Sequence, residues 1–343
     1  MLTLKNLCYH LQEDESMINK AAQAFRSLVY DENKHSYLLS RISESSQACD
    51  LSVPCNCDGY GRIHHFRRII DSKWVEDPLP MDPACHALGI PAVDIIETQV
   101  FQLAACNVNC WYCFVPNALK CADSKMSRWF TAEEMVKSYR DCTRNIRVLD
   151  LSGGNPELCP EWILDSMRAL EKMNLSEDVY LWSDDTLTTD FLFDMDRRDI
   201  AYMSSYPMYG KVCCFKGFDE ESFSFNSGLE PKSYEGQFQR FERYLDLGFD
   251  LYGYVTLTCG DTVNIEEKIN TFLDRLQKIH PLLPLRTIPL KILVFTPTQK
   301  RMNAVYTDAL NNQFIAIDAW KKSLKKRFSD LLLCKKVYEN MLE

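Results

Sequence analysis

From residue 95 onward, short apolar runs alternate with longer amphipathic segments, and this alternation constrains the fold more than any other feature of the chain. The apolar runs have the length and the β-branched and aromatic content of buried strands. They lie at residues 95–105, 147–152, 179–182, 211–216, 249–258 and 288–295, with a short one at 200–203. Helical patterns lie at 131–145, 160–173, near 187–197, 234–247 and 263–279. Parallel strands with helical crossovers explain this order, so we expect an α/β protein.

About six strand–helix units begin at the first of these strands, which is too few for an eightfold barrel. We therefore expect a partial (β/α)6 barrel or an open sheet. In either form, the loops at the carboxyl ends of the strands converge on one site although they lie far apart in sequence. The polar loops in question are 106–113, 152–156, 183–186, 216–219 and 296–298.

The two ends of the chain differ in character from this core. Residues 1–94 are expected to form a helical and then cysteine- and proline-rich extension. Within it, apolar stripes predict one helix over 17–29 and a second, short helix over 34–43. Residues 301–343 are expected to form C-terminal helices. The predicted organisation is therefore an extension, a core over 95–300 and a helical C-terminal region.

Three cysteines directly follow the first core strand. Cys106, Cys110 and Cys113 have the spacing C-x3-C-x2-C, with Tyr112 just before the third cysteine. Three thiolates on one loop can hold three irons of a [4Fe–4S] cluster and leave the fourth iron open to another molecule. A zinc site would need a fourth Cys or His at a matching spacing, and the next cysteine, Cys121, does not provide it. Buried structural cysteines remain the alternative.

Composition limits the class of protein. The chain has 343 residues, 15 of them cysteines, and its first residues show no basic region followed by an apolar core. We therefore expect a cytoplasmic protein with reduced thiols and metal ligands, not a disulfide framework. No run approaches the roughly 18 apolar residues of a membrane span. The net charge of −9 argues against general binding to nucleic acid.

Four further cysteines lie in the proline- and glycine-rich stretch 49–94. They are Cys49, Cys55, Cys57 and Cys85. Four thiolates could ligate a second iron–sulfur cluster, or a zinc ion with the help of a neighbouring histidine. Free thiols in an irregular extension are the alternative.

The cysteine loop resembles the signature of the radical S-adenosylmethionine (SAM) superfamily, in which an aromatic residue precedes the third cysteine. A second resemblance follows one helix and one strand later, in Ser152, Gly153, Gly154, Asn155 and Pro156. In that superfamily a Gly-Gly-Glu-Pro segment receives the amino group of the methionine part of SAM. Asn155 replaces the more usual acid, and its side-chain carbonyl can still accept a hydrogen bond from an ammonium group.

Two further segments of the core resemble this superfamily. Lys216 ends the segment 211–216 as in the activating-enzyme-like branch, where the lysine contacts the SAM carboxylate or ribose. Cys214 stands where that branch has an aspartate, which disfavours a glycyl-radical-activating function. Ser183 and Asp184 resemble the turn that follows the third strand of the family. The resemblance covers residues 95–300 and none of the first 94.

The resemblance implies an enzyme with a [4Fe–4S] cluster and SAM as cofactors. Reductive cleavage of SAM would give a 5′-deoxyadenosyl radical that removes hydrogen from a substrate. It also implies a reducing partner of the flavodoxin or ferredoxin type. A glycyl residue on a partner enzyme, a protein or peptide side chain and a small molecule all remain open as substrates. A non-catalytic zinc- or thiol-rich α/β protein is the alternative, although it would not need the paired glycines or Lys216.

Overall fold

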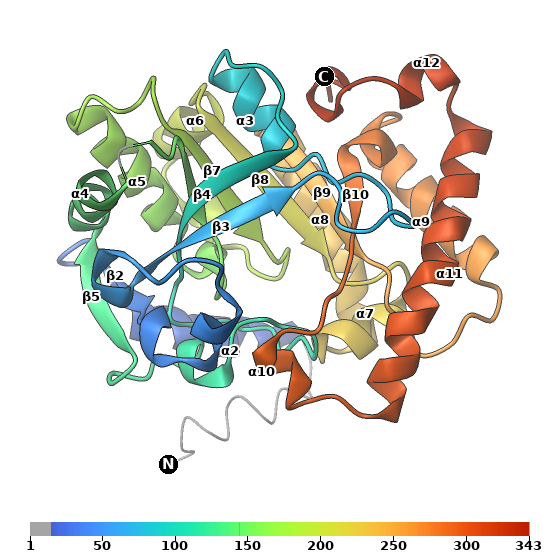
Figure 1. Ribbon diagram of the computed structural model, residues 1–343, viewed down its shortest axis with the longest axis horizontal. Helices are drawn as coiled ribbons and strands as arrows, with labels where there is room; N and C mark the ends of the chain where they lie inside the picture. The colour runs from blue at the N-terminus through green and yellow to red at the C-terminus, as the bar shows by residue number, and fades with distance from the viewer. Residues whose placement is uncertain (1–14, 144, 343) are drawn as a thin grey trace.

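The computed structural model describes residues 15–143 and 145–342 (Figure 1). The residues from which the lack of a secretion signal was inferred lie outside this range. The main sheet has seven strands in the order β10-β9-β8-β7-β6-β4-β3. Its parallel strands are β4 (Ile95–Phe101), β6 (Val148–Leu151), β7 (Tyr180–Asp185), β8 (Tyr209–Phe215), β9 (Leu251–Thr256) and β10 (Thr287–Leu290). The sheet is curled into a half-barrel, which confirms the expected partial (β/α)6 barrel.

Helices cover the convex, outer face of this sheet (Figure 1). They include α4 (Ala132–Cys142), α5 (Pro160–Lys172), α6 (Arg197–Ser204), α7 (Glu220–Ser227), α8 (Tyr234–Asp246), α9 (Ile265–Ile279) and α11 (Ala304–Arg327). Phe215 on β8 marks the outer face, because its ring packs against Phe238 of α8 and Phe272 of α9. Helix α4 begins at a capping box in which Thr131 and Glu134 satisfy each other's backbone N–H groups. No helix in the described part of the chain is both long and apolar enough to cross a membrane.

The N-terminal extension packs against the core and contributes a strand to its sheet. Helix α2 (Glu15–Val29) confirms the first predicted helix. The second, over 34–43, is wrong, because β2 (Ser36–Ser40) occupies that stretch and pairs with β1 (Tyr30–Asp31) and β5 (Ser127–Thr131). Tyr37 and Leu39 are fully buried there, so pairing and burial override the local helical pattern. Strand β3 (Gly61–Arg67), which was not predicted, joins the main sheet antiparallel to β4.

One smaller expectation in the core is corrected, and the C-terminal region contains helices. The short strand expected at 200–203 lies inside α6, whose N-cap Asp196 accepts a hydrogen bond from the backbone of Arg198. Ile200 and Met203, three residues apart, are the buried side chains of this helix. The C-terminal helices expected over 301–343 are the long helix α11, whose last turn is basic, and the short helix α12 (Asp330–Leu333), while a further short helix, α10 (Thr296–Gln299), precedes α11.

The segment 68–80, here called the closing segment, crosses from the end of β3 to the opposite edge of the sheet and leads into α3 (Met81–Ala87) (Figure 1). The indole nitrogen of Trp74 donates to the carbonyl of Pro289 on β10 over 2.9 Å. Lys291 pairs with Asp71 at 2.6 Å, and the hydroxyl of Tyr254 on β9 donates to Asp77 over 3.0 Å. The closing segment therefore spans the gap between the two edge strands of the half-barrel.

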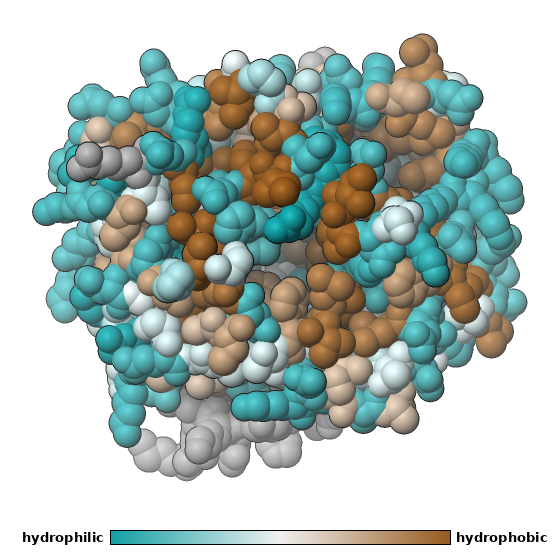
Figure 2. Space-filling view, in the orientation of Figure 1, coloured by the Kyte–Doolittle hydropathy of each residue, from teal (hydrophilic) through white to brown (hydrophobic). Residues whose placement is uncertain are grey.

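The face that carries the closing segment also exposes apolar side chains. Figure 2 shows hydrophobic patches gathered near the middle of this view, beside the strand edges. Ile69 and Ile70 follow β3, and Leu293 and Val294 follow β10, and all four are exposed. Exposed apolar residues thus follow both edge strands of the half-barrel, β3 and β10.

Candidate functional site

The cysteine loop leaves the carboxyl end of β4, where the sequence predicted it. The amide of Cys106 donates to the carbonyl of Lys120 over 3.2 Å. From the other end of the chain, Arg301 donates to the carbonyls of Cys110, Trp111, Cys113 and Val115 over 2.8 to 3.4 Å. One guanidinium thus fixes the part of the loop that carries two of the three cysteines.

A buried lysine lies beside the three thiols. Burial raises the pKa of Cys106 to about 12, and the neighbouring Cys113 and Cys110 add to this, while Lys120 opposes it. Lys120 is only 5% exposed and forms no ion pair with a carboxylate in the described ranges. Burial lowers the pKa of Lys120, but the three thiols outweigh it and the pKa lies above the ordinary value. Because a buried ammonium is costly without an anion, this arrangement fits three thiolates that hold an anionic cluster.

The geometry does not match a site for one metal ion. Within residues 15–143 and 145–342, no three His, Cys, Asp or Glu side chains are placed to hold a single ion. A zinc ion draws its ligands around one point, whereas the irons of a cube-shaped cluster stand at separate corners. Cys106, Cys110 and Cys113 are thus not gathered around one point in the described structure.

Gly153 and Gly154 hold the second predicted loop against the cysteine loop. Both have positive φ, 95° and 70°, a conformation that glycine adopts without strain. A Cβ atom on Gly154 would lie 2.2 Å from the carbonyl oxygen of Leu103 and 2.6 Å from that of Ala105. The amide of Asn155 donates to the Ala105 carbonyl over 2.7 Å. The glycines thus allow close contact between two backbones, and this contact sets the start of the cysteine loop.

Asn155 is fully buried and bonded within the protein. Its side-chain nitrogen donates to the oxygen of Asn107 over 2.7 Å, and its oxygen accepts from the amide of Glu157 over 3.3 Å. It thereby caps a short 3-10 helix that begins with Pro156. Asn107 in turn donates to Thr188 over 2.9 Å, beyond the end of β7. These bonds tie three of the predicted loops together, and a contact from Asn155 to a cofactor stays a prediction.

Four other predicted residues gather on the concave, inner face below the cysteine loop. The hydroxyl of Tyr112 lies 3.0 Å from the hydroxyl of Thr256 on β9. Ser152 donates to the carboxylate of Asp184 over 2.5 Å. Burial lowers the pKa of Lys216, but Tyr112 and nearby thiols outweigh it and raise it well above the ordinary value. The structure therefore brings Tyr112, Ser152, Asp184 and Lys216 to the same side as the three thiols.

Ser183 lies on the other face of the sheet. Its hydroxyl is 2.7 Å from that of Tyr209, and its register partner on β8 is Lys211. Lys211 is fully buried under the helices, where it pairs with Glu157 and with Asp185. Burial raises the pKa of Glu157 to about 7, while Lys211 opposes this. The structure does not bring Ser183 together with the inner-face residues. On the outer face, the ion pair between Lys211 and Glu157 instead joins β8 to the loop after β6.

The four cysteines expected to form an additional site are not brought together. Cys49 is exposed, while Cys57 contacts Ser138 and Cys142 beside α4. Cys55 and Cys57 precede β3, whereas Cys85 lies on α3, beyond the other end of that strand. A strand of this length separates its ends by roughly 20 Å, at about 3.3 Å per residue. A site shared by all four therefore does not form, because an unpredicted strand separates them.

Sequence reasoning missed two residues that shape the loop. Lys120 lies in an irregular segment without periodicity, so nothing in the sequence indicates that it is buried. Arg301 is 190 residues away from Trp111, one of the residues whose carbonyls it binds. A buried cation close to a cysteine motif is a signal worth seeking, but its burial becomes visible only in the fold.

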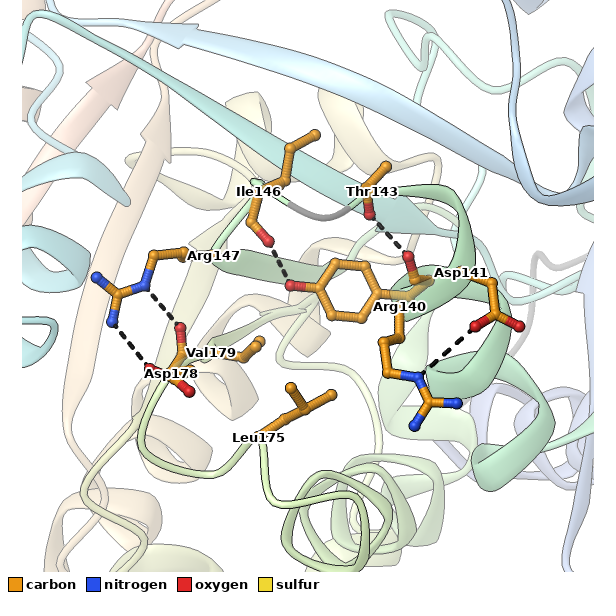
Figure 3. Close-up of a pocket in the computed structure, with 9 residues that line it drawn as sticks. Arg140, Asp141, Thr143, Ile146, Arg147, Leu175, Asp178 and Val179 are labelled. Atoms are coloured by element: carbon orange, nitrogen blue, oxygen red, sulfur yellow. Dashed lines mark hydrogen bonds and ion pairs between the residues drawn. The ribbon is translucent and has the colours of Figure 1, made fainter.

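A hollow of about 750 Å³ lies away from these residues (Figure 3). It is lined by Tyr139, Arg140, Asp141, Thr143, Ile146, Arg147, Leu175, Asp178 and Val179. Arg147 and Val179 directly precede β6 and β7, so the hollow lies at the amino ends of the strands. Ligands of parallel sheets bind at the carboxyl ends, where the cysteine loop lies. We therefore place the candidate site at the cysteine loop.

Comparison with known families gives one match. Residues 97–200 match the model of the 4Fe-4S single cluster domain. This range begins in β4, contains the cysteine loop and the Gly153–Gly154 turn, and reaches α6. The match confirms the iron–sulfur cofactor expected from the sequence and agrees with the resemblance to the radical SAM superfamily. A search of the curated proteins found no relative with significant similarity.

Several solved structures share part of the fold. Streptococcus suis SuiB bound to the precursor peptide SuiA is 13% identical, with a TM-score of 0.37, and the match covers 51% of this chain and 36% of SuiB. Native anSMEcpe with bound AdoMet is 15% identical, with a TM-score of 0.39, and the match covers 56% of this chain and 50% of that protein. The matched region thus spans half or less of the length of these two proteins.

Proposed function

We propose that this protein is a radical SAM enzyme in which Cys106, Cys110 and Cys113 hold a [4Fe–4S] cluster. The observation that carries the proposal is the set of three thiols around the buried ammonium of Lys120, within a segment that matches an iron–sulfur domain. When bound, the reduced cluster supplies the electron that cleaves SAM and yields a radical able to remove hydrogen from a substrate.

The residues of this chain have distinct parts in the proposal. Lys120 compensates the negative charge of the thiolates and cluster. We expect Lys216 and Ser152, on the inner face, to contact the carboxylate and polar groups of SAM. Tyr112 and Thr256 close the space between the cysteine loop and β9. The closing segment covers the gap in the half-barrel and helps to keep water from a reactive radical.

A partner must supply the electron. We propose a small reducing protein of the flavodoxin or ferredoxin type, as the resemblance to the radical SAM superfamily implies. A cytoplasmic setting, in which the thiols stay reduced, belongs to the same proposal.

The proposal is tested by anaerobic reconstitution with iron and sulfide, followed by iron counting and EPR after reduction. We expect about four irons per chain and a spectrum that changes when SAM is added, because SAM binds the open iron. Replacement of Cys106, Cys110 or Cys113 with Ala should abolish iron retention and SAM cleavage.

Cys121→Ala serves as the matched control, since this thiol lies on the same loop but contacts the Asn117 carbonyl. We expect Cys121→Ala to retain about four irons. A preparation that holds one tight zinc and no iron would replace the proposal with the zinc-binding alternative. Full SAM cleavage by a Cys110→Ala variant would refute the ligand assignment.

A further inference from the structure

Three buried charged side chains and one partly buried carboxylate meet on the inner face without forming ion pairs. They are Arg62 on β3, Asp150 on β6, Asp184 on β7 and Lys216 after β8, and in the described ranges none forms an ion pair with another charged side chain. Burial lowers the pKa of Arg62, while the electrostatic influence of Asp150, Asp184 and Cys55 acts in the opposite direction. Two cations and two carboxylates thus lie within electrostatic range of one another, with no direct contact between opposite charges.

The register of the sheet places Arg62 and Asp150 in one row. Arg62 is opposite Val100 on β4, and Val100 is opposite Asp150 on β6. Residues paired across neighbouring strands point to the same face, so both side chains point to the inner face. Asp150 precedes Ser152 by two residues, so on this face it lies one step further from the cysteine loop than Ser152 does.

Each member of this pair has an unused hydrogen-bonding atom. Arg62 is 5% exposed and Asp150 is 1% exposed. The Nε atom of Arg62 and the Oδ1 atom of Asp150 are both buried without a hydrogen-bond partner in the described part of the chain. The guanidinium lies 5.3 Å from the ring centre of Phe114, which directly follows Cys113. A buried polar atom without a hydrogen-bond partner costs free energy. We therefore expect a bound molecule to supply partners for these two atoms.

The SAM site proposed above accounts for Lys216 and Ser152, and Asp184 accepts the hydrogen bond of Ser152, but neither Arg62 nor Asp150 has a part in it. We propose that Arg62 and Asp150 anchor the substrate by a carboxylate and an adjacent N–H group, the chemistry of an α-amino acid. This inference rests on the proposed function, because it places the substrate beside the proposed SAM site.

The two side chains match the two parts of such a group. The Nε and Nη atoms of a guanidinium form a fork that binds a carboxylate through two parallel hydrogen bonds. A carboxylate oxygen such as Oδ1 of Asp150 accepts from an ammonium or amide N–H. A free amino acid and the C-terminal residue of a peptide both offer this chemistry, and the experiment separates these two sources.

The test measures binding to the reconstituted full-length protein by isothermal titration calorimetry. The probes are the twenty free amino acids and twenty Ala-Ala-X tripeptides, each tripeptide also in its C-terminally amidated form. We expect at least one free amino acid or tripeptide acid to bind, and an amidated tripeptide to bind more than tenfold more weakly than the corresponding tripeptide acid. Binding by free amino acids alone, or by tripeptide acids as well, identifies the source of the group.

Variants then test the two residues. Arg62→Met should weaken binding more than tenfold, and Arg62→Lys should weaken it less. Asp150→Asn should weaken binding of a free amino acid more than that of a tripeptide, because only the free amino acid carries an ammonium group next to its carboxylate, where the tripeptide has a neutral amide N–H. Arg67→Met, on the exposed end of the same strand, is the matched control and should bind as the unaltered protein does.

Iron counting on every variant separates folding and cluster loading from substrate binding. A protein that loads iron and cleaves SAM, yet binds none of these probes, would overturn the substrate inference and leave the proposed function standing. Binding that is unchanged in Arg62→Met would overturn it as well. A protein that loads no iron would count against the proposed function, and the probes are then titrated against the iron-free chain to decide the substrate inference separately.

Discussion

At the scale of single residues, Lys120 most sharply distinguishes this site from a chance group of cysteines. The three thiols were predicted from their spacing alone, because ligand identity and order along a loop are properties of the sequence. The lysine between them was not predicted, because its burial depends on the bridge between Ala105 and Cys121 and on the packing of the loop. Sequence thus indicates the candidate ligands, and the fold brings a buried positive charge near them.

A first prediction concerns Lys120. Lys120→Met should lower the reduction potential of the cluster by roughly 60 mV or more, a tenfold change in the equilibrium constant for one electron. The reason is that a buried positive charge stabilises the reduced, more negative form. Redox titration followed by EPR measures the shift. Lys120→Arg should keep most of the potential, and Lys125→Met, on the exposed part of the same segment, should leave it unchanged. An unaltered potential in Lys120→Met would contradict this role.

At the scale of elements, the parallel strands of the core were predictable, whereas in the extension only helix α2 was. The core strands were found because parallel, doubly covered strands are continuous apolar runs. Strand β2 read as a helix and β3 read as a loop, because both are defined by partners far along the chain, β5 and β4. The parallel topology also predicted that the loops at the carboxyl ends of the strands meet. The hydrogen bonds Ser152–Asp184 and Asn107–Asn155 join these loops in the structure.

A second prediction belongs to the junction between the cysteine loop and the C-terminal region. Arg301→Ala removes four hydrogen bonds to loop carbonyls. A chelator should then remove the cluster at least several-fold faster, because the loop would move more freely. A hydrogen bond to a charged group contributes about 1.5 to 3 kcal/mol. Release of iron to a chromogenic chelator, followed over time, measures this. The neighbouring exposed Lys300→Ala is the control, and equal release rates for both variants would show that Arg301 does not stabilise the loop.

At the scale of the whole molecule, the closing segment completes the wall of the half-barrel and buries Asp77. Burial raises the pKa of Asp77 to about 7, while hydrogen bonds from the Leu79 amide and the Tyr254 hydroxyl, and the charge of Arg68, act in the opposite direction. The folded state therefore holds a proton on this carboxyl group that the unfolded chain releases at a lower pH. None of this was visible in the sequence, where 68–80 reads as a loop.

A third prediction follows from the direction of this shift. Because the folded pKa is the higher one, the stabilisation is fully present below the unfolded pKa and is lost as pH rises toward 7. In that interval Asp77 should reduce the free energy of unfolding by about 1.4 kcal/mol per pH unit. Asp77→Asn, which cannot ionise, should lack this component. Urea unfolding of both proteins at pH 5, 6 and 7 measures the difference, and parallel pH profiles would show that Asp77 does not titrate in this range.

The closing segment also has a consequence for the order of assembly. Its contacts join residues separated by 177 to 220 positions, from Asp77 and Tyr254 to Asp71 and Lys291. Such contacts carry a large loop-closure cost and form after local ones. During synthesis, the closing segment is therefore made long before β10, and it can complete the wall of the half-barrel only after β10 has formed. Until then the inner face stays open to water, and iron, sulfide and SAM have a wider approach to it than the finished molecule offers.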